Sequence, residues 1–183
     1  MKSLLNNEQK NKLLKIARDT ITEYVKNKKI LEIKETDPLL NQKLGAFVSL
    51  HINKELRGCI GNIVGQKPLC LTIRDMAIAS ATEDPRFRPL TKEELPLIHI
   101  EISVLSALKK IIDPNEITLG KHGVIVKKGI KSGVFLPQVA TETCWTKEEF
   151  MNNLCIHKAG LSKNAWRNGE CEIYIFSADV FEE

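Results

Sequence analysis

Residues 46–60 read AFVSLHINKELRGCI, and this stretch decides how the first part of the chain folds. Apolar and polar residues alternate from Ala46 to Ile52, and they alternate again from Leu56 after the polar triplet Asn53-Lys54-Glu55. A period of two is typical of a half-buried strand, so two such runs around a short turn predict a β-hairpin.

A continuous core face in this hairpin fixes which residues lie opposite each other. It requires Ile52 to pair with Leu56 across a loop of three residues, and it places Leu50 opposite Gly58 and Val48 opposite Ile60. The other face then carries His51 beside Arg57 and Ser49 beside Cys59. The pattern therefore predicts one apolar face and one face with chemically functional side chains.

The elements around the hairpin follow from helical and strand periodicity. Residues 7–29 have a helical apolar stripe that Asn6 or Asn7 can cap, and a second helix begins after Pro68 and ends near Asp84-Pro85. Thr91-x-x-Glu94 is typical of a capping box for one short turn. Residues 97–105 then alternate, which predicts a strand with isoleucines on one face and His99, Glu101 and Ser103 on the other.

The second half of the chain repeats this plan. Residues 123–126 and 133–136 predict two short strands, with Pro137 ending the second, and Thr146 caps a helix that Gly160 terminates before a closing strand over 171–176. We therefore expect an α+β fold of two related strand-strand-helix halves that share a mostly antiparallel sheet. We expect a single domain over 1–183, with lobes of about 1–95 and 96–183.

Composition limits the class of protein. The chain has 183 residues, 43% of them hydrophobic, and a net charge of +4 that is spread along the sequence, so charge does not indicate nucleic acid, although such a partner stays open. No apolar run is long enough to cross a membrane and no signal peptide is evident, which favours a cytoplasmic protein. Five cysteines without a C-x-x-C pair indicate free thiols, and the sequence contains no cofactor or metal motif.

The segment Leu56-Arg57-Gly58-Cys59-Ile60-Gly61 is the strongest candidate for chemistry. Glycines inside a strand are tolerated where a ligand or another backbone comes close, and Arg57 on the same face as Cys59 can stabilise a thiolate or hold an anion. Cys59 is then a nucleophile and Gly58 and Gly61 admit substrate. The alternative is that Cys59 is a small buried residue and that the glycines let a helix pack closely on the sheet.

Three further places have both a functional and a structural interpretation. Arg86 beside Asp84 is either an anion-binding group or part of a turn network around Phe87. Glu101 is the best candidate for a general base if its face lines a cleft, with Ser103 beside it, and otherwise both are outward polar residues. His122 enters a strand at a turn, where it binds substrate or is simply a turn residue.

The hexapeptide Leu56–Gly61 resembles the signature of the AMMECR family, which is named for a chromosomal region linked to Alport syndrome with midface hypoplasia and elliptocytosis. Further segments match that family's pattern in the same order from about Gly45 onward: Asp84 with Arg86-Phe87 and Pro89-Leu90, Glu101–Leu105, His122-Gly123, Leu136–Val139 and Lys158–Leu161. The resemblance implies an α+β fold of two related β-rich halves that carry helices. It also implies the company of Memo-like and radical-SAM proteins, and hence modification of a nucleobase, RNA or another small aromatic substrate.

Two functional hypotheses follow. In the first, the protein is an enzyme or enzyme subunit with a cleft between its halves, in which Cys59 is the nucleophile, Glu101 accepts a proton, and an anionic or nucleobase-type small molecule is bound. The binding residues of this hypothesis are Arg57, Gly58, Gly61, Asp84, Arg86, Ser103 and His122. In the second, the protein is a non-catalytic binding module that accompanies a Memo-like or radical-SAM partner or serves as an RNA-binding accessory.

Overall fold

The computed structural model describes residues 4–183, which form two compact units. The first unit comprises the chain up to Leu105 together with Asp179–Glu183, and the second comprises Ser106–Ala178. The α+β class and the antiparallel pairing agree with expectation. The strands are nevertheless divided between two four-stranded sheets instead of sharing one, because each unit buries its own hydrophobic cluster.

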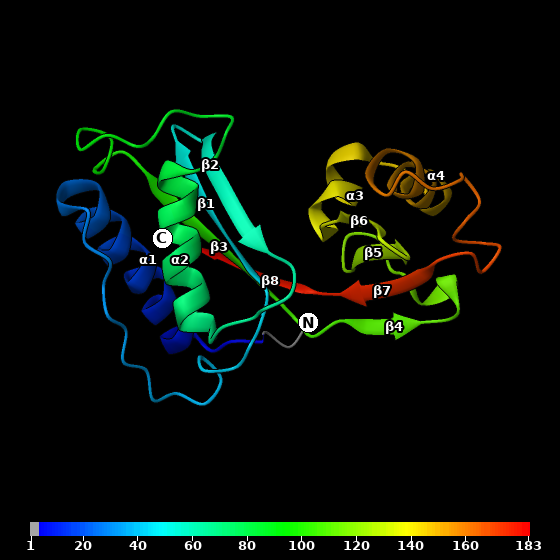
Figure 1. The fold of residues 1–183 in the computed structure, drawn as a ribbon, viewed down its shortest axis with the longest axis horizontal. Helices are drawn as coiled ribbons and strands as arrows, with labels where there is room; N and C mark the ends of the chain where they lie inside the picture. The colour runs from blue at the N-terminus through cyan, green and yellow to red at the C-terminus, as the bar shows by residue number, and fades with distance from the viewer. Residues whose placement is uncertain (1–3) are drawn as a thin grey trace. The chain divides into compact units, whose positions relative to one another are not determined.

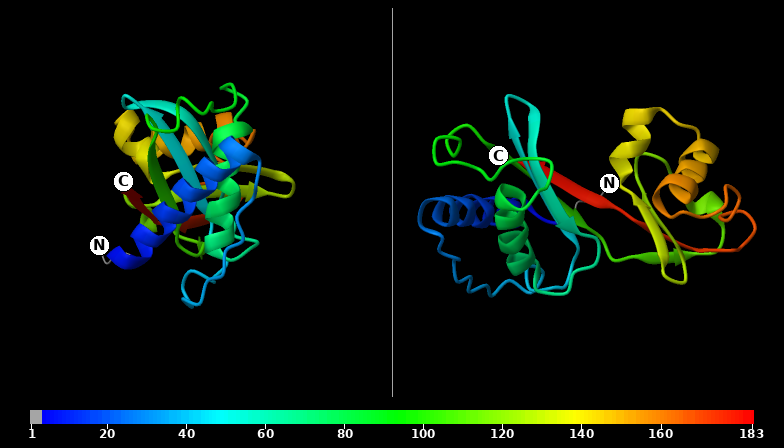
Figure 2. Two further views of the ribbon diagram at one scale, coloured as in Figure 1. Left: turned by 90° about the vertical axis from the view of Figure 1, so that its left-hand side faces the viewer. Right: turned by 45° about the horizontal axis from the view of Figure 1, so that its top comes forward.

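The first unit packs two helices, α1 (Asn7–Asn27) and α2 (Leu69–Thr82), against one sheet (Figures 1 and 2). The strands of this sheet are β1 (Ala46–Ile52), β2 (Glu55–Asn62), β3 (His99–Leu105) and β8 (Ala178–Glu182), in the order β2-β1-β3-β8. Since β3 pairs with β1, the first unit extends to Leu105, beyond the boundary near residue 95 that the sequence suggested.

The hairpin β1-β2 differs from the expected register at its turn. Leu50 pairs with Gly58 as predicted, but the register shifts after Leu50, so that Ile52 pairs with Glu55 and His51 with Leu56. The prediction that Ile52 pairs with Leu56 was therefore wrong. The turn has only two central residues, Asn53 and Lys54, both with positive φ (53° and 69°), and the bulge at Arg57 restores the parity of the two strands.

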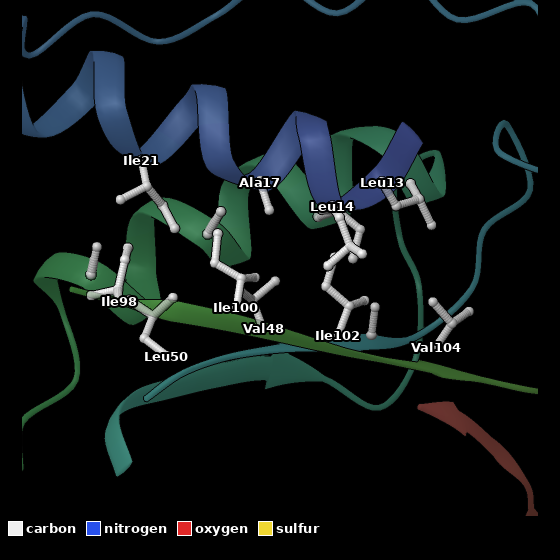
Figure 3. Packing of buried hydrophobic residues seen from close by; sticks show 14 of the residues in the cluster. Leu13, Leu14, Ala17, Ile21, Val48, Leu50, Ile98, Ile100, Ile102 and Val104 are labelled. Carbon is white, nitrogen blue, oxygen red and sulfur yellow. The ribbon is translucent and has the colours of Figure 1, made fainter. Parts of the chain in front are cut away.

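The core of the first unit lies between the two helices and the apolar face of the sheet. Figure 3 shows Leu13, Ala17 and Ile21 of α1 directed toward the strands, and their side chains are fully buried. The facing strand residues in the same cluster are Val48, Leu50, Ile100, Ile102 and Val104. Because successive strand residues point to opposite faces, this apolar face leaves Ser49, Cys59 and Glu101 on the other one.

The second unit has a sheet of its own with helices packed on it. Its strands are β4 (Lys109–Ile111), β5 (Gly123–Lys128), β6 (Lys131–Phe135) and β7 (Glu172–Phe176), in the order β4-β7-β5-β6. Its helical segments are the short turn η1 (Pro114–Glu116), α3 (Pro137–Thr143), α4 (Lys147–Asn153) and a wider helical turn, η2 (Leu154–Lys158).

Two features of the second unit bear on the sequence predictions. Thr146 and Glu149 form the predicted capping box of α4, and Gly160 has the positive φ (62°) expected of a residue that ends a helix. Pro137 does end the preceding strand, but it also occupies the first turn of α3, which the sequence analysis missed. Across residues 4–183, no helix combines the length and the apolar character that a membrane span requires.

Candidate functional site

The polar face of the first sheet places Cys59, Ser49 and Glu101 in one row across three strands. Ser49 pairs with Cys59 on β2 and with Glu101 on β3, so the three residues are direct cross-strand neighbours on the same face. The Ser49 hydroxyl donates a hydrogen bond to Cys59 Sγ at 3.1 Å. Ser49 is buried, whereas Cys59 and Glu101 are half-buried. The prediction that Ser49 lies beside Cys59 is confirmed.

A hollow of about 430 Å³ includes the Glu101 end of this row. His51 and His99, which are cross-strand partners, line it together with Lys54 and Glu182. His99 Nε2 lies 3.1 Å from Glu182 Oε2. The wall of this hollow thus combines cationic and imidazole nitrogens with two carboxylates, and it can offer a bound molecule both donors and acceptors.

Asp84 fixes the backbone of Cys59 from the loop after α2. Its side chain is 2% exposed, and its Oδ2 accepts the Cys59 backbone N–H at 2.8 Å. The Arg86 guanidinium donates to both carboxylate oxygens, at 2.9 and 2.7 Å, and the Arg86 backbone N–H adds a bond of 3.1 Å. These hydrogen bonds, led by the one from the Arg86 side chain, hold the pKa of Asp84 well below its usual value.

Arg57 makes a similar pair with a carboxylate on the loop before β3. Its Nε and Nη2 donate to the two oxygens of Glu94 at 2.9 and 3.1 Å, and its Nη1 donates to the Arg88 carbonyl at 3.0 Å. The hydrogen bond from Arg57 lowers the pKa of Glu94 to about 2. The Phe87 ring lies 6.0 Å from Arg57 Cζ and 5.4 Å from Arg86 Cζ, so both guanidiniums contact one aromatic ring.

The two glycines that flank Cys59 are explained by close approach. A Cβ on Gly58 would lie 2.1 Å from the Ser80 carbonyl oxygen, so α2 can contact β2 only at a residue without a side chain. A Cβ on Gly61 would lie 2.2 Å from the ring of Phe47, which covers that position from β1. The interpretation in which glycines permit close helix packing holds for Gly58, while Gly61 makes room for an aromatic ring.

Ser103 and His122 are the two remaining predicted site residues. Ser103 is buried and pairs with Phe47, two pairs along the ladder from Glu101 and on the same face. His122 belongs to the second unit, where its Nδ1 accepts the Thr118 N–H at 3.2 Å and burial lowers its pKa. The first unit therefore contains all the predicted site residues except His122, which belongs to the second: Arg57, Gly58, Cys59, Gly61, Asp84, Arg86, Glu101 and Ser103.

Three residues of the site were not singled out by the sequence analysis. The sequence pattern explains Glu94 as a capping residue, and its carboxylate does accept the Thr91 N–H at 2.9 Å. Because this local role is sufficient, the sequence does not indicate the pairing of Glu94 with Arg57. No motif or periodic pattern marks Lys54 or Glu182 as a site residue, because only the hairpin turn and the pairing of β8 with β3 bring them to the hollow. Within residues 4–183, no three His, Cys, Asp or Glu side chains are grouped closely enough to hold a metal ion.

Comparison with known proteins places this geometry in a family. A sequence model of the AMMECR1 family matches residues 14–181. Protein MK0488 of Methanopyrus kandleri is 43% identical over 180 residues, covering 93% of this chain and 86% of that protein. Protein NEQ441 of Nanoarchaeum equitans is 41% identical over 179 residues, which cover 93% of this chain and 98% of the relative.

A solved structure supports the same assignment. The crystal structure of the uncharacterized protein PH0010 from Pyrococcus horikoshii has a TM-score of 0.87 and 39% sequence identity, and the match covers 98% of this chain and 93% of that one. The names of these relatives state no activity, substrate or partner.

Proposed function

Because the chain belongs to the AMMECR1 family, and the names of its matched relatives state no activity, we propose a function from the polar face of the first sheet. The protein is an enzyme, or a subunit of one, that acts on a small molecule with an anionic or nucleobase-type group. The observation that carries the proposal is the 3.1 Å hydrogen bond from Ser49 to the Cys59 sulfur, with Glu101 directly opposite Ser49.

Cys59 is the nucleophile in this proposal. A thiol reacts as its thiolate, and the Cys59 sulfur accepts a hydrogen bond from the Ser49 hydroxyl. Asp84 holds the Cys59 backbone through the amide N–H, which fixes the direction of the side chain relative to Ser49. The sulfur therefore has both a hydrogen-bond donor and a fixed position, two requirements for covalent catalysis.

Glu101 is the proton acceptor. It lies on the opposite side of Ser49 from Cys59, and it lines the hollow of about 430 Å³. A carboxylate at the edge of such a hollow can accept a proton from a bound substrate. His51, His99 and Lys54 supply donors around it, so the hollow suits a planar heterocycle whose edge carries both donors and acceptors.

The two arginines have a restricted role. Arg57 donates hydrogen bonds from both Nε and Nη2 to Glu94. Arg86 donates from Nε and Nη2 to Asp84, but its side chain is 55% exposed. An anionic substrate group is therefore held by Arg86 from its exposed side, and Arg57 acts mainly by fixing the loop that carries Glu94.

A second function is favoured by the packing around Cys59. The spaces beside Gly58 and Gly61 are taken by the Ser80 carbonyl and the Phe47 ring, so neither glycine opens a path for substrate toward the half-buried thiol. This packing favours a binding module over covalent catalysis at Cys59. In that case the protein holds a small molecule for a partner of the Memo-like or radical-SAM type and changes no bond itself.

Ligand capture followed by turnover tests both functions. The full chain is purified gently, retained small molecules are identified by native mass spectrometry, and nucleobases, nucleotides and carboxylates are then screened by thermal shift at low and high salt. The variants are Cys59→Ser and Glu101→Gln, with Glu142→Gln as a matched control because Glu142 is an exposed carboxylate on α3 of the second unit. A ligand of this site raises the melting temperature of the parent and of Glu142→Gln, but not that of Glu101→Gln.

Incubation of that ligand with the protein then separates the two functions. An enzyme changes the mass of the ligand, or leaves an adduct on Cys59, and Cys59→Ser does neither while still binding. Binding without any chemical change in parent or variant supports the module instead. If Glu101→Gln is stabilised as strongly as the parent, the ligand binds elsewhere and both proposals for this face are wrong.

A further inference from the structure

We propose that Cys155 and Cys171, in the second unit, form a redox-active dithiol that reacts with hydroperoxides and closes to a disulfide. The proposal is independent of the sheet face that carries Cys59, because both cysteines belong to Ser106–Ala178. It assigns a modification site to two thiols that lie far apart in the sequence. In the structure both are free thiols.

The backbone between the two cysteines turns back on itself. After η2 the Leu161 N–H donates to the Cys155 carbonyl at 2.8 Å, and the Glu170 N–H donates to the Ala165 carbonyl at 3.1 Å. Trp166 anchors this segment through a buried bond of 3.0 Å from its Nε1 to Asn152 Oδ1 on α4. Cys171, which directly precedes β7, packs against the hydrophobic cluster that contains Cys155.

The two thiols have unequal surroundings. Cys155 is fully buried, and its hydrogen bond with Cys171 together with burial raises its pKa. Cys171 is half-buried, and the same hydrogen bond, now accepted by its sulfur, lowers its pKa against the opposing effects of burial and of the Glu170 carboxylate. The accessible sulfur is thus the one that is more readily ionised, whereas the buried one keeps its proton.

Cys171 is also the member of the pair that a small oxidant can reach. It lines a hollow of about 510 Å³ together with Trp166, Arg167, Lys127 and Lys128. Glu170 and Glu172 line the same hollow, and Lys128 forms an ion pair with Glu170 at 2.9 Å. Cys155 is fully buried and does not line this hollow, so a small oxidant reaches Cys171 first, as an attacking thiol with a resolving partner requires.

The reaction balances with a hydroperoxide as the oxidant. The Cys171 thiolate attacks the terminal peroxide oxygen, an S–O bond forms, the O–O bond breaks, and the leaving alkoxide takes up a proton as an alcohol, or as water from hydrogen peroxide. The Cys155 sulfur then attacks the sulfenic sulfur of Cys171, the S–S bond forms, and the S–O bond breaks. The departing hydroxide leaves as water with the Cys155 proton, so two thiols have given two electrons to one peroxide.

Peptide mapping of the full chain tests the proposal with hydrogen peroxide as the probe. The reduced protein is treated at neutral pH, its remaining thiols are alkylated, and it is digested with trypsin. Cleavage after lysine and arginine places the two cysteines on separate peptides, Glu148–Lys158 and Asn168–Glu183, each with a single cysteine. We expect these two peptides to become joined, with a mass lower by two hydrogens than their sum, and to separate again on reduction.

The time course of thiol loss during peroxide treatment gives a quantitative test. Free Cys171 and free Cys155 should be lost one for one, and severalfold faster than free Cys144, which is exposed but has no cysteine partner in the proposal. Cys144→Ser is the matched control and should form the joined peptide at the parent's rate. Cys59→Ser should also leave it unchanged, so this result does not depend on the function proposed for the sheet face.

Single variants then identify the attacking thiol. Cys155→Ala should accumulate sulfenic acid on Cys171, which dimedone traps, whereas Cys171→Ser should leave Cys155 unoxidised. If Cys155→Ala does not fold, dimedone added to the parent decides, because it should label Cys171 and reduce the joined peptide. The proposal is overturned if no joined peptide forms, or if Cys171 is lost no faster than Cys144.

Discussion

Replacing Asp84 by asparagine tests whether its carboxylate holds the Cys59 strand in place. The side chain is 2% exposed and accepts four hydrogen bonds, three from Arg86 and one from the Cys59 N–H. Asparagine has the same shape and keeps one acceptor oxygen, but its amide group turns two donors toward a guanidinium that is itself only a donor. The variant should therefore fold and be destabilised.

The size of the effect follows from the exposure of the two partners. Breaking a fully buried ion pair costs about 3 to 5 kcal/mol, but Arg86 regains water because its side chain is 55% exposed. We therefore expect a loss of about 2 to 3 kcal/mol, which corresponds to a fall in melting temperature of roughly 4 to 12 °C for a chain of this size. Asp19→Asn is the control, because Asp19 forms an exposed pair with Lys15 that contributes about 0.5 kcal/mol or less.

The pH dependence of this loss has a defined sign. The folded protein holds the pKa of Asp84 below its ordinary value of 3.8, so the carboxylate stabilises the fold fully above about pH 4. As the pH falls below that value the unfolded chain becomes protonated first, and the advantage of the parent over Asp84→Asn shrinks. Thermal melts of both proteins between pH 7 and pH 2 measure this difference.

Two results would refute the reasoning about Asp84. One is an Asp84→Asn protein that melts within about 1 °C of the parent at pH 7, since a loss of 2 kcal/mol would lower the melting temperature by at least about 4 °C. The other is a difference between the two proteins that stays constant down to pH 2, because a carboxylate with a lowered pKa must contribute less there.

The faces of the first sheet could be predicted from the sequence, whereas its turn could not. Alternation alone placed Ser49 beside Cys59 and Glu101 on the polar face, because side-chain direction in a strand depends only on parity. The turn depends on backbone conformation at Asn53 and Lys54, which adopt positive φ although neither is glycine. A pattern of residue types cannot show that choice, and the bulge at Arg57 follows from it.

The contacts that build the site were harder to predict than its strands. Arg57 and Glu94 are separated by a helix and a loop, and Glu94 already had a sufficient local explanation as the partner of Thr91. Likewise, Cys155 and Cys171 have no metal-type or C-x-x-C spacing, so only the turn between them brings the thiols together. Pairings of this kind depend on the path of loops, which carries no periodic signal.

Two further substitutions test the packing and the ion pair beside Cys59. Gly58→Ala should cost about 3 kcal/mol in denaturant unfolding, because its Cβ would lie 2.1 Å from the Ser80 carbonyl oxygen. Gly129→Ala has no neighbour within 4 Å, so it should cost only about 1 kcal/mol through its positive φ, and equal losses would contradict the close-approach argument. The pair of Arg57 and Glu94 should show a coupling of about 1 to 2 kcal/mol in a double-mutant cycle at pH 7, because the two side chains are only 13% and 16% exposed. Since the folded-state pKa of Glu94 is about 2 against an ordinary 4.5, this coupling should be complete above about pH 5 and decline as the pH falls toward 2. A coupling that is absent at pH 7, or unchanged near pH 2, would show that Arg57 is not held by Glu94 and would make its guanidinium available to an anionic substrate.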